Sequence, residues 1–167
     1  MRMILLSLLL AACTYPGVEP TPLPAPSLDD VVDAYPCGYG FQAGNPEQTV
    51  GIFLNPVDFG LFERAGAQTV DTDLPGGNWG GVVAQGSNLF ANWCDDVFEE
   101  GEPTSYRVAE FPIVGGHLTV TLEQPQNGCA GLAITAELTS LVVEVDGEKV
   151  DLGDLTITNE AWGCFAG

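Results

Sequence analysis

An Asp-Gly pair at Asp146-Gly147 stands between two runs of β-branched residues, and it constrains the fold more than any other part of the chain. Asp-Gly suits the two-residue type I′ turn of a β-hairpin, because both turn positions need a positive φ angle. In that register Glu144 faces Lys149, an opposite-charge pair that stabilises neighbouring strands. We therefore expect an antiparallel hairpin at this place.

Apolar residues on both sides of this hairpin continue the same pairing outward. The apolar alternation changes phase on the two arms at one level, near Thr139-Ser140 and Gly153-Asp154. Because a change of phase turns the other face of a strand inward, we expect a bend with the register kept. The expected pairs are Leu141 with Leu152, Leu138 with Leu155, and Ala136 with Ile157.

A second hairpin is expected upstream, with Gly115-Gly116 as its turn. The residues 109–113 and 118–122 alternate between apolar and other side chains on either side of this pair, and Gly-Gly belongs to the same family of turns. Pro112 would confine its arm to an edge or a kinked strand, since proline lacks a backbone N–H.

Shorter segments complete the expected fold. Residues 49–55 read as a strand, and 80–84 are expected to pair with 88–93 around a turn at 85–87. No long stretch has a convincing helical period, and short strands with turn signals every ~8–12 residues are typical of a sandwich or barrel. We expect an all-β fold, an antiparallel two-sheet sandwich of immunoglobulin-like architecture built from hairpins.

Residues 1–13 carry the features of an export signal. Arg2 makes the start basic, Ile4 to Leu10 is apolar, and the small pair Ala11-Ala12 precedes Cys13. A secretory signal has this layout, and the apolar run is far shorter than the ~20 residues that span a bilayer. Leu10 to Cys13 resembles the lipobox of bacterial lipoproteins. An ordinary cleaved signal with an incidental cysteine is the alternative.

The lipoprotein resemblance implies a location and a partner. Cys13 would become the acylated N-terminus of the mature chain and anchor it to a lipid bilayer, since two or more acyl chains hold firmly to a membrane. The resemblance also implies the cell envelope. The residue after the cysteine is Thr14 rather than the aspartate that favours retention in the inner membrane, which indicates the outer membrane.

The remainder divides into a tether and a domain. Proline recurs at every second position from Pro20 to Pro26, which favours extended polyproline II and a reach of roughly 40 Å for residues 14–27. A proline-rich ligand for a partner is the alternative. We expect a signal peptide at 1–12, the lipidated cysteine and tether at 13–34, and a single β domain at 35–167.

Four further cysteines are expected to form two disulfides. An even number of cysteines in an exported chain is typical of a disulfide framework. The register of the 142–150 hairpin, carried to its ends, places Cys129 against Cys164. By elimination, Cys37 pairs with Cys94.

Composition excludes some partners. The 4 Lys and Arg face 23 Asp and Glu, for a formal charge of −19, and removal of residues 1–12 takes away Arg2 and makes it −20. Binding of nucleic acid depends on basic residues that neutralise phosphates, so we expect no nucleic-acid partner. The expected partner is instead an unknown envelope protein or a glycan.

Catalytic patterns are scarce, so we expect no enzyme. His117 is the only histidine, and no serine stands in a Gly-x-Ser-x-Gly elbow. Paired carboxylates of a glycosidase lie about 5–10 Å apart, but acidic residues are so abundant that no pair stands out. A small hydrolase is the least favoured function.

Two binding functions are the alternatives to a structural module. Ca²⁺ prefers carboxylate oxygens, and Asp71-Thr72-Asp73 begins like a calcium loop, although Pro75 occupies the third ligand place. We expect no cofactor other than this ion. The other metal candidates are Asp95, Asp96 and Glu99. Trp79 lies among glycines that suggest a loop tip, where a flat ring could stack on a sugar.

Overall fold

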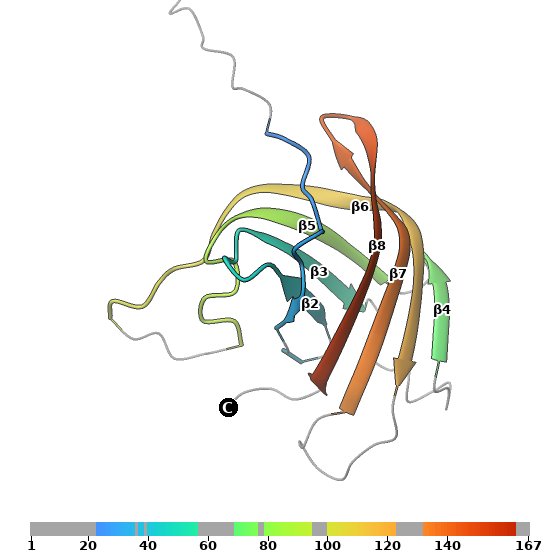
Figure 1. The fold of residues 1–167 in the computed structure, drawn as a ribbon, viewed down its shortest axis with the longest axis horizontal. Coiled ribbons are helices and arrows are strands. Elements are labelled where there is room, and N and C mark those ends of the chain that lie inside the picture. Colours follow the sequence, from blue (N-terminus) through green and yellow to red (C-terminus); the bar gives the residue numbers. More distant parts are fainter. Residues whose placement is uncertain are drawn as a thin grey trace, which may run out of the picture.

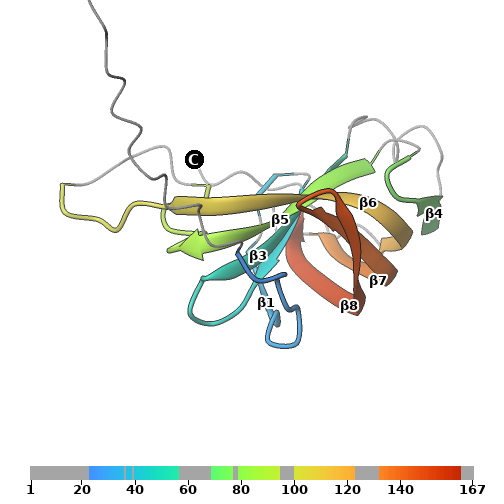
Figure 2. The same ribbon diagram turned by 90° about the horizontal axis from the view of Figure 1, so that it is seen from above.

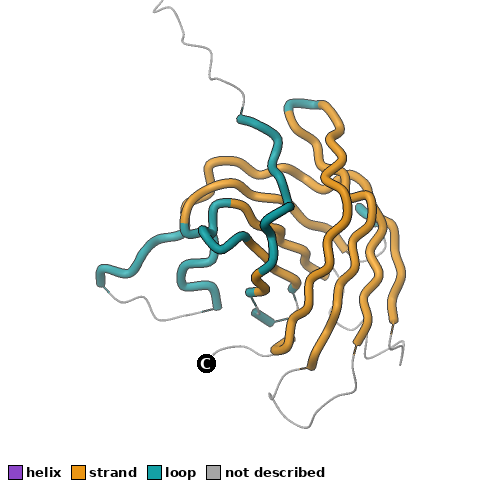
Figure 3. Tube along the Cα trace, in the orientation of Figure 1, coloured by secondary structure: helices purple, strands orange, loops and turns teal. Residues whose placement is uncertain are grey.

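The structure, a computed structural model, describes residues 23–35, 37–38, 40–56, 69–76, 79–94, 100–122 and 132–162. These residues form strands, turns and loops without a helix (Figure 3), so this part of the chain holds no helix able to cross a membrane. The prediction of an all-β fold is confirmed. The strands are β1 (Asp33–Ala34), β2 (Phe41–Gly44), β3 (Val50–Pro56), β4 (Thr69–Asp73), β5 (Trp79–Ser87), β6 (Tyr106–Leu122), β7 (Leu132–Val145) and β8 (Glu148–Trp162).

All eight strands belong to one antiparallel sheet in the order β1-β2-β3-β5-β6-β7-β8, with β4 paired to β6. The long strand β6 joins the two parts, because residues 106–112 pair with β5 and residues 113–122 pair with β7. The sheet curls into a half-barrel, so β2 comes close to β8 without pairing to it (Figure 1, Figure 2). The described strands therefore do not form the two separate sheets of the expected sandwich.

The β7–β8 hairpin follows the predicted register near its turn, where Glu144 faces Lys149. The predicted bend is confirmed, because Leu138 and Leu141 are both buried although they are three positions apart. The prediction that Leu141 faces Leu152 is wrong, since Leu141 faces Gly153 across a bulge. Ser140 and Gly153 take positive φ angles of 50° and 81° there. The outer predicted pairs are confirmed: Leu138 faces Leu155 and Ala136 faces Ile157.

Gly115-Gly116 is not a hairpin turn, which corrects the sequence prediction. β6 continues through the pair without reversing, and its pairing with β7 is irregular on either side of Gly115. A Cβ atom on Gly116, where φ is 122°, would lie 3.1 Å from both the Leu141 Cα and the Ser140 carbonyl oxygen. The glycines therefore let β6 bend close to the bulge of β7. The signal for a tight turn and the signal for a bulge use the same residue type.

Pro112 lies inside β6 opposite Val82, directly before Ile113, where pairing with β7 begins. The expected second arm at 88–93 is also wrong. Those residues form turns after β5, and β5 pairs with β3 and β6 instead. Residues 88–94, which we call the strap, lie on the outer face of the sheet, away from the main core.

The main core lies on the inner face of the curled sheet. It contains every second residue of the central strands, including Ile52, Val83 and Leu118, which are all fully buried. A separate apolar cluster lies on the outer face, where Phe53 and Ala84 pack against Leu89 and Phe90 of the strap. The alternation of strand side chains thus supplies two cores of different size.

Candidate functional site

Two of the predicted metal candidates meet the only histidine on the outer face of the sheet. Asp73 of β4 faces His117 of β6, and Asp71 faces Thr119. His117 Nδ1 lies 3.0 Å from Asp73 Oδ1, and Nε2 lies 4.0 Å from Asp71 Oδ1. Thr119 Oγ1 donates a hydrogen bond of 2.7 Å to Asp71 Oδ1. Sequence reasoning missed this cluster because Asp73 and His117 are 44 positions apart.

The geometry of this cluster suits an ion pair rather than catalysis. A catalytic triad needs a nucleophile next to the free nitrogen of the histidine, whereas both His117 nitrogens face carboxylates. The side chain of His117 is 45% exposed and that of Asp73 is 92% exposed, so water screens their attraction. Within the described ranges, no three His, Cys, Asp or Glu residues are positioned around one metal ion.

A row of threonines crosses the same outer face next to this cluster. Thr69, Thr121, Thr135 and Thr158 stand opposite one another on β4, β6, β7 and β8. The hydroxyls of Thr135 and Thr158 lie 3.3 Å apart. Cross-strand threonine pairs stabilise a sheet, so this row accounts for a regular polar surface over the inner core.

An aromatic stack joins the strap to the outer face of the sheet. The Phe90 ring lies parallel to Tyr35 at 3.9 Å between centroids and is stacked on Phe53 at 4.9 Å. Arg107 places its guanidinium 4.2 Å from the centre of the Phe53 ring, and it forms an ion pair with Glu110. Burial raises the pKa of Tyr35 above its ordinary value of 10.0, and the negative charge of Asp33 acts in the same direction.

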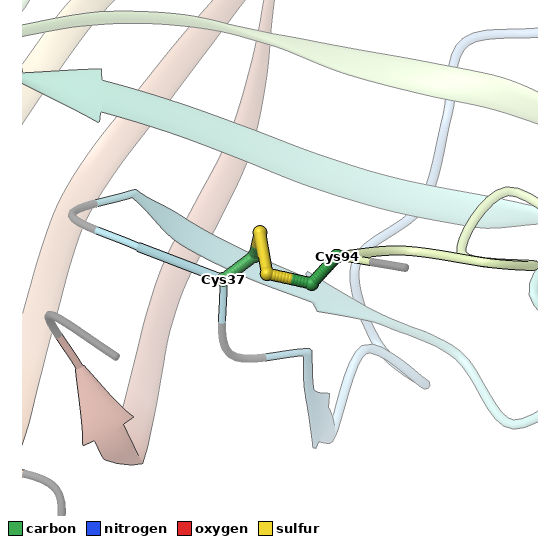
Figure 4. Close-up of a disulfide and its surroundings, with 2 residues drawn as sticks. All are labelled: Cys37 and Cys94. Carbon is green, nitrogen blue, oxygen red and sulfur yellow. A yellow bond between two sulfur atoms is a disulfide. The ribbon is translucent and has the colours of Figure 1, made fainter. Parts of the chain in front are cut away.

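The predicted disulfide between Cys37 and Cys94 is confirmed. It joins the turn before β2 to the end of the strap, and the two Cα atoms are 5.4 Å apart (Figure 4). The second predicted pair, Cys129 with Cys164, lies outside the described residues. The register on which that prediction depends shifts by one position between Ile134 and Leu132.

Trp79 is not the exposed loop-tip residue that the glycine-rich sequence indicated. It begins β5 opposite Pro56, it is only 2% exposed, and its ring lies 5.5 Å from that of Phe41. The residue therefore belongs to the inner core, and its ring is not available to stack on a sugar. Glycines flank Trp79 because Gly76 pairs with it and Gly81 lies close to the backbone of β3.

The other predicted site residues are not placed. Cys13, Asp95, Asp96 and Glu99 lie outside the described residues. A shallow pocket of about 230 Å³ is lined by Asp30, Val32, Pro46 and Glu47. This volume is below the roughly 300–1,000 Å³ of typical small-molecule sites, so the pocket is a weaker candidate than the two outer-face clusters.

The sequence matches no family model, and neither curated proteins nor solved structures show significant similarity to it.

Proposed function

We propose that the chain is a lipid-anchored protein of the bacterial cell envelope, and that its β domain has a non-enzymatic structural or binding role. The observation that carries this proposal is the succession of basic start, apolar run, small pair and cysteine at residues 1–13. A chain processed at this motif begins with acylated Cys13, and the proline-rich segment then separates the β domain from the lipid surface.

Two properties of the domain support an extracytoplasmic location, and Thr14 in place of an aspartate after the cysteine favours the outer membrane. The Cys37–Cys94 disulfide is of a kind that persists in oxidising compartments and is rare in the cytosol. We also propose the second crosslink, between Cys129 and Cys164, on the same grounds. The formal charge of the full chain, −19, becomes −20 once residues 1–12 with Arg2 are removed. This charge favours solubility and opposes contact with anionic headgroups, which fits a domain held away from the membrane.

The experiment is mass spectrometry of the mature protein expressed in a bacterium with its own export signal. We expect the wild-type chain to begin at Cys13 and to carry the additional mass of acyl chains. Cys13→Ser should lose both the acyl mass and the anchoring to membranes. Cys37→Ser is the matched control, because it replaces a cysteine outside the motif and leaves residues 1–13 intact. Equal masses for wild type and Cys13→Ser, apart from the substitution, would end the proposal.

A binding function for divalent cations is the second candidate. Its candidate ligands are the carboxylates of Asp71 and Asp73, which lie on the same face of β4, since Ca²⁺ takes carboxylate and other oxygen ligands. The test compares thermal unfolding in EDTA and in millimolar Ca²⁺. A higher melting temperature in Ca²⁺ that Asp71→Asn abolishes would support the candidate, and identical melting temperatures would remove it.

A further inference from the structure

Phe90 of the strap occupies a slot in the outer face of the sheet. Gly44 of β2 and Gly51 of β3 face each other, and a Cβ atom at either position would collide with the Phe90 ring. These two glycines form the floor of the slot, and the rings of Tyr35 and Phe53 are both stacked with Phe90. The slot is therefore shaped by strands that belong to the sheet, whereas its occupant comes from the strap.

The two ends of the strap are attached differently. At its start, Leu89 N donates a 3.0 Å hydrogen bond to the Gln48 carbonyl, and Ser105 Oγ donates a 3.1 Å bond to the Leu89 carbonyl. Toward its end, the Trp93 backbone N–H bonds only to Phe90 within the strap. Among the described residues, that half also has a bond of 3.4 Å from Asn92 Nδ2 to the Pro103 carbonyl. The second half is thus held by this bond, by the packing of the Trp93 ring against Phe53 and covalently by the disulfide.

The backbone and the indole group at this end are also unfavourably placed. Asn92 and Cys94 have φ angles of 53° and 70°, in the left-handed region that side-chain-bearing residues avoid, although asparagine tolerates it better than cysteine. The Nε1 atom of Trp93 is buried without a hydrogen-bond partner. Opening of the strap would relax Cys94 and would let water satisfy this donor.

We propose that the Cys37–Cys94 disulfide is a redox latch, and that its reduction frees the strap and opens the aromatic slot while the sheet stays folded. Both cysteines are half-buried, and the reductant that the latch requires is a dithiol. One thiolate of the dithiol attacks Cys37 or Cys94 and forms a mixed disulfide, and the second thiol resolves it. The reductant becomes a cyclic disulfide, and both cysteines leave as thiols after transfer of two electrons and two protons. This device does not depend on the lipid anchor.

The experiment measures hydrogen exchange of the full chain by mass spectrometry, with and without dithiothreitol. In the reduced protein, exchange protection of the strap peptide should fall by about tenfold or more, while the peptides of β7 and β8 keep theirs. Cys37→Ser/Cys94→Ser should show the same open strap without reductant. Cys129→Ser/Cys164→Ser is the matched control, and its strap should remain protected until reductant is added.

Two results would overturn the latch. If strap protection is unchanged in the reduced protein and in Cys37→Ser/Cys94→Ser, the hydrogen bonds and the stacked rings alone hold the strap. If protection is lost in every strand at once, the disulfide stabilises the whole domain and does not control the strap alone.

Discussion

Replacement of Gly116 by alanine tests the bend that replaced the expected hairpin turn. Gly116 has a φ of 122°, and a Cβ atom there would meet the backbone of β7 at 3.1 Å on Leu141 and on Ser140. A side-chain-bearing residue in such a conformation costs about 1–3 kcal/mol, and forcing atoms into a packed contact costs another ~1–3 kcal/mol. The lower flexibility of unfolded alanine offsets about 0.4–1 kcal/mol of this sum. We expect Gly116→Ala to lose roughly 2–5 kcal/mol of unfolding free energy.

Gly153→Ala is the matched control on the same bend. Its φ is 81°, but no atom lies within 4 Å of the position that a Cβ atom would take, so only the backbone cost of about 1–2 kcal/mol remains. Urea unfolding followed by tryptophan fluorescence measures both variants. With a slope of about 2 kcal/mol per molar urea, Gly116→Ala should shift the midpoint by roughly 1–2.5 M, and Gly153→Ala by only about 0.5–1 M. Equal shifts would refute the contact between β6 and β7, because a glycine in an open turn would show the backbone cost alone.

Three other variants probe the two cores and the polar cluster. Trp79→Ala should cost about 3–5 kcal/mol of stability in the same urea assay, because its ring fills the inner core; near-normal stability would contradict the burial of Trp79. Since the pKa of folded Tyr35 is raised by burial, its contribution to stability is complete below about pH 10 and is lost as pH rises through the folded pKa. The stability of Tyr35→Phe should therefore fall less than that of wild type as the pH rises above about 10, and equal pH profiles for the two proteins would count against this. His117→Ala should leave the urea midpoint close to that of wild type, because the ion pair with Asp73 is exposed to water; a large loss of stability would show that the pair is strongly coupled.

Local signals in the sequence were sufficient for the β7–β8 hairpin. Asp146 and Gly147 take the positive φ angles that their turn needs, and the pairing depends only on neighbours along the chain. The bend was also readable, because a change of apolar phase on both arms reports the change of buried face directly. The Cys37–Cys94 pair was predicted by elimination, after the register of the hairpin had been extended to pair Cys129 with Cys164. That register does not continue unchanged beyond Ile134.

The candidate site was predicted only in part. Asp71 and Asp73 were recognised by their residue type, but their approach to His117 required the pairing of β4 with β6. No local pattern in the sequence indicates which distant strand lies beside β4. For the same reason the Gly44–Gly51 slot for Phe90 was not foreseen, since it needs the pairing of β2 with β3 and the return of the strap to the outer face.

The sequence by itself determined the strand character of the chain, the tight turn at Asp146-Gly147 and the phase change beside it, because these depend on the conformational preferences of single residues and their neighbours. Only the tertiary structure decided whether glycines make a turn or a bend, and whether Trp79 is exposed or buried. Gly115-Gly116 can reverse a chain or let two strands approach, and the difference lies in the backbone of β7, which is distant in sequence. A glycine removes a steric restriction, and the surrounding fold decides how that freedom is used.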